Sequence, residues 1–263
     1  MCLVLFAWRA HPRFPLVLAA NRDEFHQRPS APADFWPEAP DILAGRDLLA
    51  GGTWLGVTRS GRFAAITNYR EPSAPEIPLE HSRGQLVRDF LEGDRPPLGH
   101  ARDLVESADG YRGFNLLIGA PGELAYVSNR SANPGPVSAG IHGLSNHLLD
   151  TDWPKVRSGR ERLARLLEPA NPDPDALFAL LTDRVLTPGP IPRDIEKSLA
   201  PEQLMKHYFI QSPVYGTRCS TVLLIGRDGE VQFHERQFNP EGQETGTRSF
   251  TFRSPAGGSE SLR

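Results

Sequence analysis

Four pairs of short apolar runs, each pair joined by a tight turn, most constrain what this chain can fold into. The connections include Ser60-Gly61, Pro121-Gly122 and Asp228-Gly229, which are residue pairs typical of hairpin turns. The paired runs cover residues 2–8 with 16–20, 54–58 with 63–67, 114–119 with 124–128, and 221–225 with 231–235. The pattern predicts β-hairpins, and therefore sheets that are mainly antiparallel.

Amphipathic segments lie between the hairpins and predict helices. One follows Ser82, whose spacing to Gln85 is that of a capping box, and Gly93 is a plausible stop. A second follows Asp152, and a third covers residues 177–181. Hairpins that alternate with such helices predict an α+β fold, a four-layer αββα sandwich of two antiparallel sheets flanked by helices.

No flexible linker divides the 263 residues. We therefore expect one domain over residues 1–253 and a flexible, Gly- and Ser-rich tail over residues 254–263. Prolines cluster at residues 28–40, 71–78 and 188–192, where we expect loops.

Composition excludes several classes of function. A formal net charge of −3 with scattered Lys and Arg gives no sign of a nucleic-acid partner. Two cysteines cannot form a disulfide framework, and the histidines show no metal-site spacing. The first apolar run breaks at Arg9 and is too short for a signal peptide or a membrane span. We therefore expect a cytoplasmic protein without a membrane span.

Cys2 stands at the head of the first apolar run and has two possible roles. Free cysteine is a common buried residue, which is the simpler interpretation. If Met1 is removed, however, Cys2 carries both a thiol and the α-amine. An amine with a pKa of about 7.7–8.0 can take the proton from the thiol during attack on a carbonyl group.

Asp23 follows the second apolar run, within the stretch Asn21-Arg22-Asp23-Glu24. Surface ion pairs are one interpretation of this polar stretch. If the first two strands pair as a hairpin, however, the end of the second lies beside the start of the first. Asp23 would then lie next to Cys2, where a carboxylate could orient an α-ammonium group.

Five stretches of the sequence resemble the NRDE family, which includes the animal transport and Golgi organisation proteins: "MCLVLFAW", "LAANRDEF", "GGTWLGVTRSGRFAAITNYRE", "GLSNHLLDTDWPKV" and "YGTRCSTVLLI". The resemblance implies the fold of the N-terminal nucleophile hydrolases, whose members include choloylglycine and penicillin V acylases. Those enzymes use an N-terminal cysteine, an aspartate, two asparagines and an arginine. The matching residues here are Cys2, Asp23, Asn68, Asn146 and Arg218.

The resemblance also implies roles for these residues. Asn68 and Asn146 would donate hydrogen bonds to a developing oxyanion, although turn and cap roles remain open for both. Arg218 would lower the thiol pKa, or be a solvated cation. Arg22 departs from the acylase pattern by two positions, about 6–7 Å along a strand, so its role stays open.

Two classes of function follow. The first is hydrolysis of a linear amide or related acyl bond by Cys2, which requires no cofactor. The second is non-catalytic binding and transfer of haem or an acyl-CoA or lipid, because animal members of the family are linked to haem trafficking and acyl-CoA handling. Either function implies a small amphipathic or amide-containing ligand.

Overall fold

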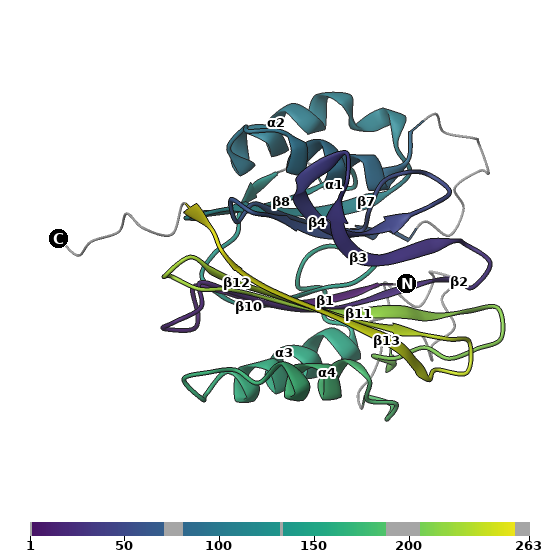
Figure 1. The fold of residues 1–263 in the computed structure, drawn as a ribbon. Coiled ribbons are helices and arrows are strands. Elements are labelled where there is room, and N and C mark those ends of the chain that lie inside the picture. Colours follow the sequence, from purple (N-terminus) through teal and green to yellow (C-terminus); the bar gives the residue numbers. More distant parts are fainter. Residues whose placement is uncertain (1, 71–80, 132–133, 188–205, 256–263) are drawn as a thin grey trace.

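The computed structural model describes residues 2–70, 81–131, 134–187 and 206–255, which form two antiparallel sheets (Figure 1). The six-stranded sheet contains, in spatial order, β10 (Gly140–Leu144), β1 (Leu3–Trp8), β2 (Leu16–Phe25), β11 (Tyr215–Ile225), β12 (Glu230–Phe238) and β13 (Glu244–Arg253). The seven-stranded sheet contains β3 (Ser30–Trp36), β4 (Ala39–Asp47), β5 (Leu55–Thr58), β6 (Phe63–Asn68), β7 (Phe114–Ala120), β8 (Glu123–Ser128) and β9 (Gly135–Pro136).

Helices cover the outer face of each sheet, which gives the four layers predicted from the sequence (Figure 1). Helices α1 (Arg83–Glu92) and α2 (Pro97–Ser107) pack on the seven-stranded sheet, and the short 3-10 helix η1 (Ala108–Gly110) follows α2. Helices α3 (Pro154–Leu166) and α4 (Pro174–Leu181) pack on the six-stranded sheet. The predicted α+β sandwich is therefore confirmed.

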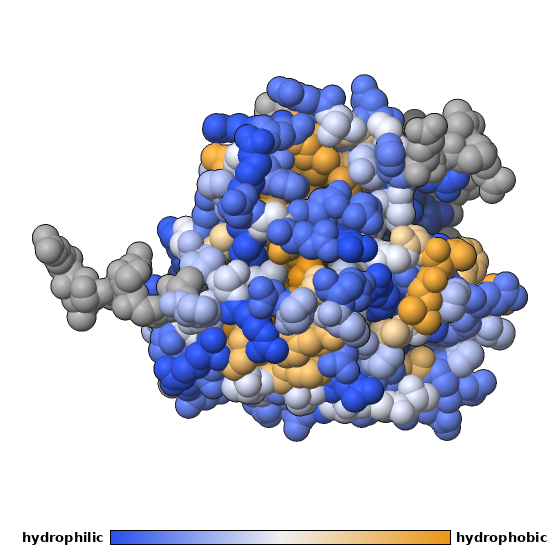
Figure 2. Space-filling view, turned by 45° about the horizontal axis from the view of Figure 1, so that its top comes forward, coloured by the Kyte–Doolittle hydropathy of each residue, from blue (hydrophilic) through white to orange (hydrophobic). Residues whose placement is uncertain are grey.

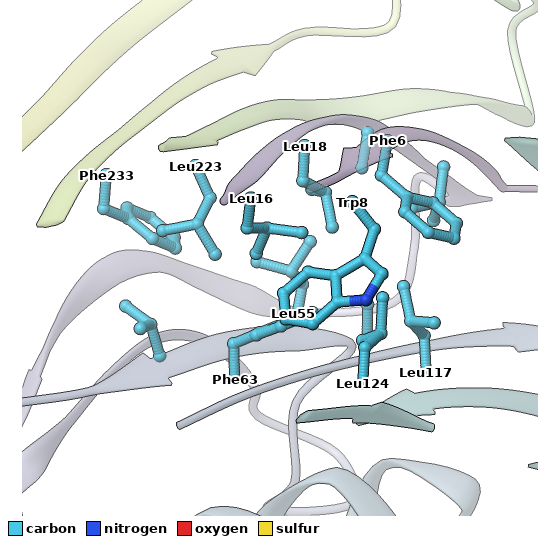
Figure 3. Close-up of a cluster of buried hydrophobic side chains, with 14 of the residues drawn as sticks. Phe6, Trp8, Leu16, Leu18, Leu55, Phe63, Leu117, Leu124, Leu223 and Phe233 are labelled. Atoms are coloured by element: carbon cyan, nitrogen blue, oxygen red, sulfur yellow. The ribbon is translucent and has the colours of Figure 1, made fainter. Parts of the chain in front are cut away.

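Strand alternation explains the layers. In β1, Val4, Phe6 and Trp8 face the second sheet, whereas Leu3 and Leu5 face α3 and α4. Figure 3 shows the layer between the sheets, where side chains such as Trp8 and Phe63 meet from opposite sides. Each large apolar side chain buried there contributes about 1.5–3 kcal/mol.

All four predicted hairpins are confirmed as the pairs β1 with β2, β5 with β6, β7 with β8, and β11 with β12. The loop predicted over residues 28–40 is wrong, because β3 and the start of β4 lie there. β3 is an edge strand with a register shift between Ala31 and Asp34, and such a position tolerates the proline at 32.

The predicted helix starts are correct to within three residues, and the helix predicted over residues 177–181 begins at Pro174. Ser82 precedes α1, but its side chain makes no capping bond, and Gln85 donates to Asp89 instead. The second helix begins at Pro154 with Trp153 as its N-cap, so the predicted cap Asp152 lies one residue early. Gly93 does end α1.

The expected loops at 71–78 and 188–192 and most of the expected tail lie outside the described residues. Ser254, at the start of that tail, donates its backbone N–H to Gly229. Figure 2 shows one face of the molecule, on which hydrophilic side chains predominate and hydrophobic ones form small separate areas. No helix in the described parts of the chain is long and apolar enough to cross a membrane.

Candidate active site

Pairing of β1 with β2 brings the start of the chain beside the polar stretch. The register pairs Leu3 with Asn21, and continued by one residue it places Cys2 opposite Arg22. Ser145, just after β10, donates its hydroxyl to the Cys2 carbonyl oxygen at 2.8 Å. Both neighbouring strands therefore hold Cys2 in place.

Arg22 lies on the face of the six-stranded sheet that meets the second sheet. It alternates with Leu18 and Ala20, which belong to the core between the sheets. Its guanidinium carbon lies 4.3 Å from the centre of the Trp54 ring, a cation–π contact. Arg22 is 6% exposed, and its Nη1 has no hydrogen-bond partner among the described residues.

Asp23 points to the other face, toward the helices. Thr217 of β11 donates its hydroxyl to Asp23 Oδ1 at 2.7 Å, and the Tyr215 hydroxyl donates to the Asp23 carbonyl oxygen at 3.0 Å. Burial raises the pKa of the Asp23 carboxyl, while the charge of Lys155 and the hydrogen bond from Thr217 oppose that rise. Thr217 of β11 therefore fixes the Asp23 carboxyl on the helix side of the sheet, near the start of β1.

The Cys2 thiol is half-buried and reduced. Burial raises its pKa, and the Asp23 charge adds to this, whereas a hydrogen bond from the Asp23 backbone and the charge of Arg22 lower it. The net shift is upward. The resting thiol is therefore neutral near pH 7, and it needs a base to become a nucleophile.

The two predicted asparagines occupy different places. Asn68, the last residue of β6, is exposed and lines the same cavity as Cys2. Asn146 is 2% exposed, and its Nδ2 donates to the Asn68 carbonyl oxygen at 2.8 Å. The backbone N–H of Arg70 donates in turn to the Asn146 carbonyl oxygen. Asn146 therefore holds the end of β6, while Asn68 faces the cavity.

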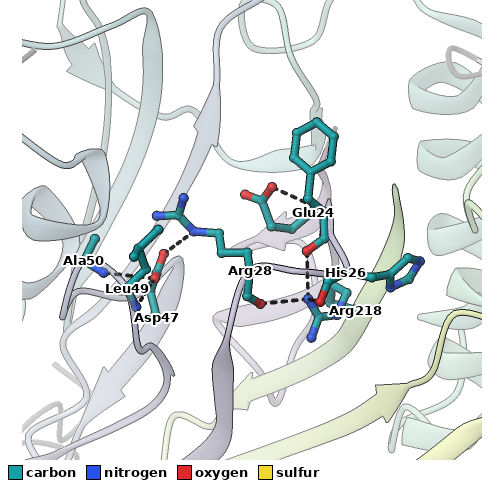
Figure 4. A network of polar contacts seen from close by, with 8 residues as sticks. Glu24, His26, Arg28, Asp47, Leu49, Ala50 and Arg218 are labelled. Atoms are coloured by element: carbon teal, nitrogen blue, oxygen red, sulfur yellow. Dashed lines mark hydrogen bonds and ion pairs between the residues drawn. The ribbon is translucent and has the colours of Figure 1, made fainter. Parts of the chain in front are cut away.

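Arg218 is the extra residue of a β-bulge, because Thr217 pairs with Asp23 and Cys219 pairs with Arg22. The Arg218 Nη1 donates to the backbone carbonyls of three residues in the β2–β3 connection, at 2.9, 3.3 and 3.0 Å (Figure 4): Phe25, His26 and Arg28. The charge of Arg22 is among the causes that lower the pKa of Cys2. The bulge directs Arg218 to the loop that borders the cavity.

The cavity next to Cys2 has a volume of about 490 Å³. Its walls come from both sheets and from the start of α1. The charged residues that line it are Arg22, Asp23, Glu24, Arg28, Asp47, Arg83 and Arg112, together with His81. Arg28 pairs with Asp47 at 2.7 Å, as Figure 4 shows, and Arg83 donates to the Gly113 carbonyl. The cavity that Cys2 lines is therefore also lined by several arginines.

Sequence reasoning missed Lys155, the second residue of α3. It is completely buried, and its ammonium nitrogen has no hydrogen-bond partner among the described residues. The spacing of Lys155, Gly159 and Leu163 is that of a buried helix stripe, and this is the signal that could have placed Lys155 inside. Arg22, whose role the sequence leaves open, is placed by its contact with the Trp54 ring.

Comparisons with known proteins agree on one family. A family model described as "Transport and Golgi organisation 2" matches residues 1–240. The Homo sapiens "Transport and Golgi organization protein 2 homolog" is 36% identical over 279 residues, covering 97% of this chain and 100% of the human protein. The Bos taurus homologue is 35% identical over 278 residues, with the same coverage of both chains.

Among solved structures, the chain is similar to a Caenorhabditis elegans N-acylethanolamine-hydrolyzing acid amidase orthologue. The TM-score is 0.48 at 11% identity, and the match covers 85% of this chain and 92% of that one.

Proposed function

The chain belongs to the transport and Golgi organisation 2 family, and from that premise we propose that it hydrolyses a linear amide or related acyl bond with Cys2 as nucleophile. One observation carries the proposal. The Cys2 thiol lies at a cavity with the Asp23 backbone beside it and Asn68 on the opposite wall. The proposed compartment is the cytoplasm, where reducing conditions keep the thiol free.

The proposed reaction starts once Met1 has been removed. The α-amine of Cys2 takes the proton of the thiol as the sulfur attacks the acyl carbonyl carbon. The ammonium then gives this proton to the leaving amine as the C–N bond breaks, which leaves a thioester on Cys2. Water, deprotonated by the same amine, hydrolyses the thioester and restores the thiol. A neutral resting thiol fits this scheme, because the base acts during the attack.

Two groups assist this chemistry. The Asp23 carboxylate orients the α-ammonium, and Thr217 fixes the carboxylate. The Asn68 amide donates to the oxyanion that develops on the acyl oxygen, a contribution of about 3–4 kcal/mol for one such donor. Asn146 holds the strand that carries Asn68.

The guanidinium groups of the cavity support a substrate with an anionic group near its acyl bond. Arg28 and Arg83 already have partners, whereas Arg22 Nη1 has none among the described residues. An ammonium or a neutral head group would leave that buried donor unsatisfied, which costs free energy. A carboxylate or a phosphate would satisfy it, and Arg binds both with good geometry.

The same observation favours a second candidate function, which is binding and transfer of an anionic amphipathic molecule such as an acyl-CoA or haem, without bond cleavage. The phosphates of an acyl-CoA or the propionates of haem would meet the cavity arginines. A carrier needs neither a free α-amine nor a thiol at the cavity wall. The thiol therefore distinguishes the two functions.

The test measures release of free acid from N-acyl amides by the mature wild-type protein. The substrates are N-acyl amino acids, which carry a carboxylate, and the matched neutral N-acyl amides. We expect turnover of the anionic series by the wild type and none by Cys2→Ala. Cys2→Ser should keep the fold and lose most of the rate, because a hydroxyl is a weaker nucleophile near pH 7.

Cys219→Ala is the matched control. Cys219 lies in β11 and is 4% exposed, so its loss should leave turnover unchanged. Full binding of the acyl compounds by Cys2→Ala, together with no turnover by the wild type, would contradict the hydrolase and leave the carrier.

A further inference from the structure

Lys155 is a buried cation in an unfavourable position. Its side chain is completely buried, so the ammonium cannot reach bulk water. It lies in the first turn of α3, where the helix dipole is positive. Its ammonium donates no hydrogen bond within the described parts of the chain. An apolar side chain of similar length would be more stable at this position.

The titratable groups near Lys155 include two groups of the candidate active site. Burial lowers the pKa of Lys155, and the charges that oppose this shift are those of Asp23 and Cys2. His207, from the chain before β11, also faces Lys155, and burial together with the Lys155 charge lowers the pKa of His207. The Lys155 ammonium, on the helix side of the sheet, is therefore close enough to the candidate nucleophile and to Asp23 for their charges to interact.

Close packing keeps the first turn of α3 in this position. A Cβ atom built on Gly159, one turn after Lys155, would lie 2.7 Å from a methyl carbon of Leu5 in β1. Only glycine allows α3 to approach β1 so closely. Trp153, which is 1% exposed, anchors the residue before the helix, and its ring centre lies 5.9 Å from the Lys155 ammonium.

We propose that Lys155 is a positioning residue of the active site, whose buried charge sets the protonation of Cys2 from the helix side of the sheet. The inference rests on the proposed function. The Asp23 carboxylate by itself favours protonated states of the nearby thiol and α-amine. The Lys155 cation offsets that carboxylate, so the amine stays neutral enough to act as a base and the developing thiolate is stabilised.

The test follows the alkylation of Cys2 by iodoacetamide from about pH 7 to pH 11, a range that extends above the ordinary thiol pKa of about 8.5 because burial raises the pKa of Cys2. Peptide mapping separates Cys2 from Cys219. In Lys155→Met, loss of the positive charge should move the alkylation midpoint up by about one pH unit, because an opposite charge near a thiol favours its ionised form. The thermal unfolding temperature should stay the same or rise.

Arg165→Met is the control, because Arg165 is an exposed cation on the same helix. Its alkylation midpoint should equal that of the wild type. If Lys155→Met does not fold, Lys155→Gln removes the charge while keeping a polar end group. An unchanged midpoint in the folded neutral variant overturns the proposal, and so does an equal shift in Arg165→Met.

Alkylation requires no hydrolysis, so the outcome for Lys155 is independent of the outcome for the proposed function. A wild-type protein that cleaves no acyl amide but shows the shifted midpoint in Lys155→Met would retain the electrostatic role and lose the hydrolase. Turnover by the wild type, together with an unchanged midpoint in Lys155→Met, would retain the hydrolase and overturn the electrostatic role of Lys155.

Discussion

The side-chain amide of Asn146 donates a hydrogen bond of 2.8 Å to the backbone carbonyl of Asn68. The family resemblance implies the same oxyanion role for both asparagines, but they occupy different positions. Asn68 is exposed at the cavity, and Asn146 is buried behind it. Their substitutions should consequently have different effects on activity and stability.

Asn68→Ala should lower the rate of acyl transfer by about 10²–10³-fold, because it removes a donor to the oxyanion. The free energy of unfolding should change by less than about 0.5 kcal/mol, as for other exposed positions. Urea unfolding and turnover of the same samples measure both. A normal rate would remove Asn68 from the oxyanion role.

Asn146→Ala should lower the free energy of unfolding by about 1–3 kcal/mol, because it leaves the Asn68 carbonyl without its buried donor. The rate falls as well, since the end of β6 loosens. Urea unfolding at constant m-value is the measurement. A variant as stable as the wild type would show that the hydrogen bond does not hold the strand.

Arg22→Gln should weaken binding of an N-acyl amino acid by about tenfold or more, which corresponds to loss of one charge-assisted hydrogen bond of about 1.5–3 kcal/mol. Binding of the matched neutral amide should change little. Calorimetric titration of a Cys2→Ala background avoids turnover. Equal losses for both ligands would indicate damage to the Trp54 contact and not a lost anion site.

His142 and Asp150 predict a pH dependence of stability. His142 Nδ1 and Asp150 Oδ2 are 2.7 Å apart, and this hydrogen bond raises the pKa of His142 although burial opposes it. A raised folded-state pKa gives stability that is fully present below the unfolded value of about 6.5 and is lost as pH rises through the folded value. The contribution is therefore larger in acid than in alkali.

Asp150→Asn tests this, because the new amide oxygen can still accept from the Gly143 N–H as Asp150 does at 2.9 Å. The variant should lose about 1–2 kcal/mol near pH 6 and less near pH 8.5, because the pair with charged His142 contributes mainly at the lower pH, whereas the Asp150–Arg160 ion pair is lost at both. Thermal unfolding of the variant and the wild type at the two pH values measures this difference. An equal loss at both would mean that the His142 charge plays no part.

The four hairpins and helices α1, α3 and α4 could be predicted from local sequence, because turn residues and apolar periodicity act within a few residues. β3 could not, since its prolines indicate a loop unless the strand lies at a sheet edge. β13 pairs with β12 along an exposed, largely polar strand, so its residues carry little apolar alternation.

In the candidate site, too, some features follow from local sequence and others depend on tertiary contacts. The first hairpin predicts that the end of β2 lies beside the start of β1, because register follows from a single turn, and the pairing of Leu3 with Asn21 confirms this. Arg218 depends on a bulge that shifts the register by one residue, which no local pattern reveals. The position of Lys155 depends on how α3 packs against β1, and that is a tertiary contact.

The most direct test of the central claim is acid-quenched mass spectrometry of the mature protein mixed with an excess of an activated acyl ester. We expect the intact mass of the wild type to increase by one acyl group, peptide mapping to locate this group as a thioester on Cys2, and Cys2→Ala to show no increase. Protein that retains Met1 should acylate far more slowly, because the Cys2 nitrogen is then a peptide N–H, which cannot accept the thiol proton. An acyl group found on Cys219, or equal acylation with and without Met1, would contradict Cys2 as an N-terminal nucleophile.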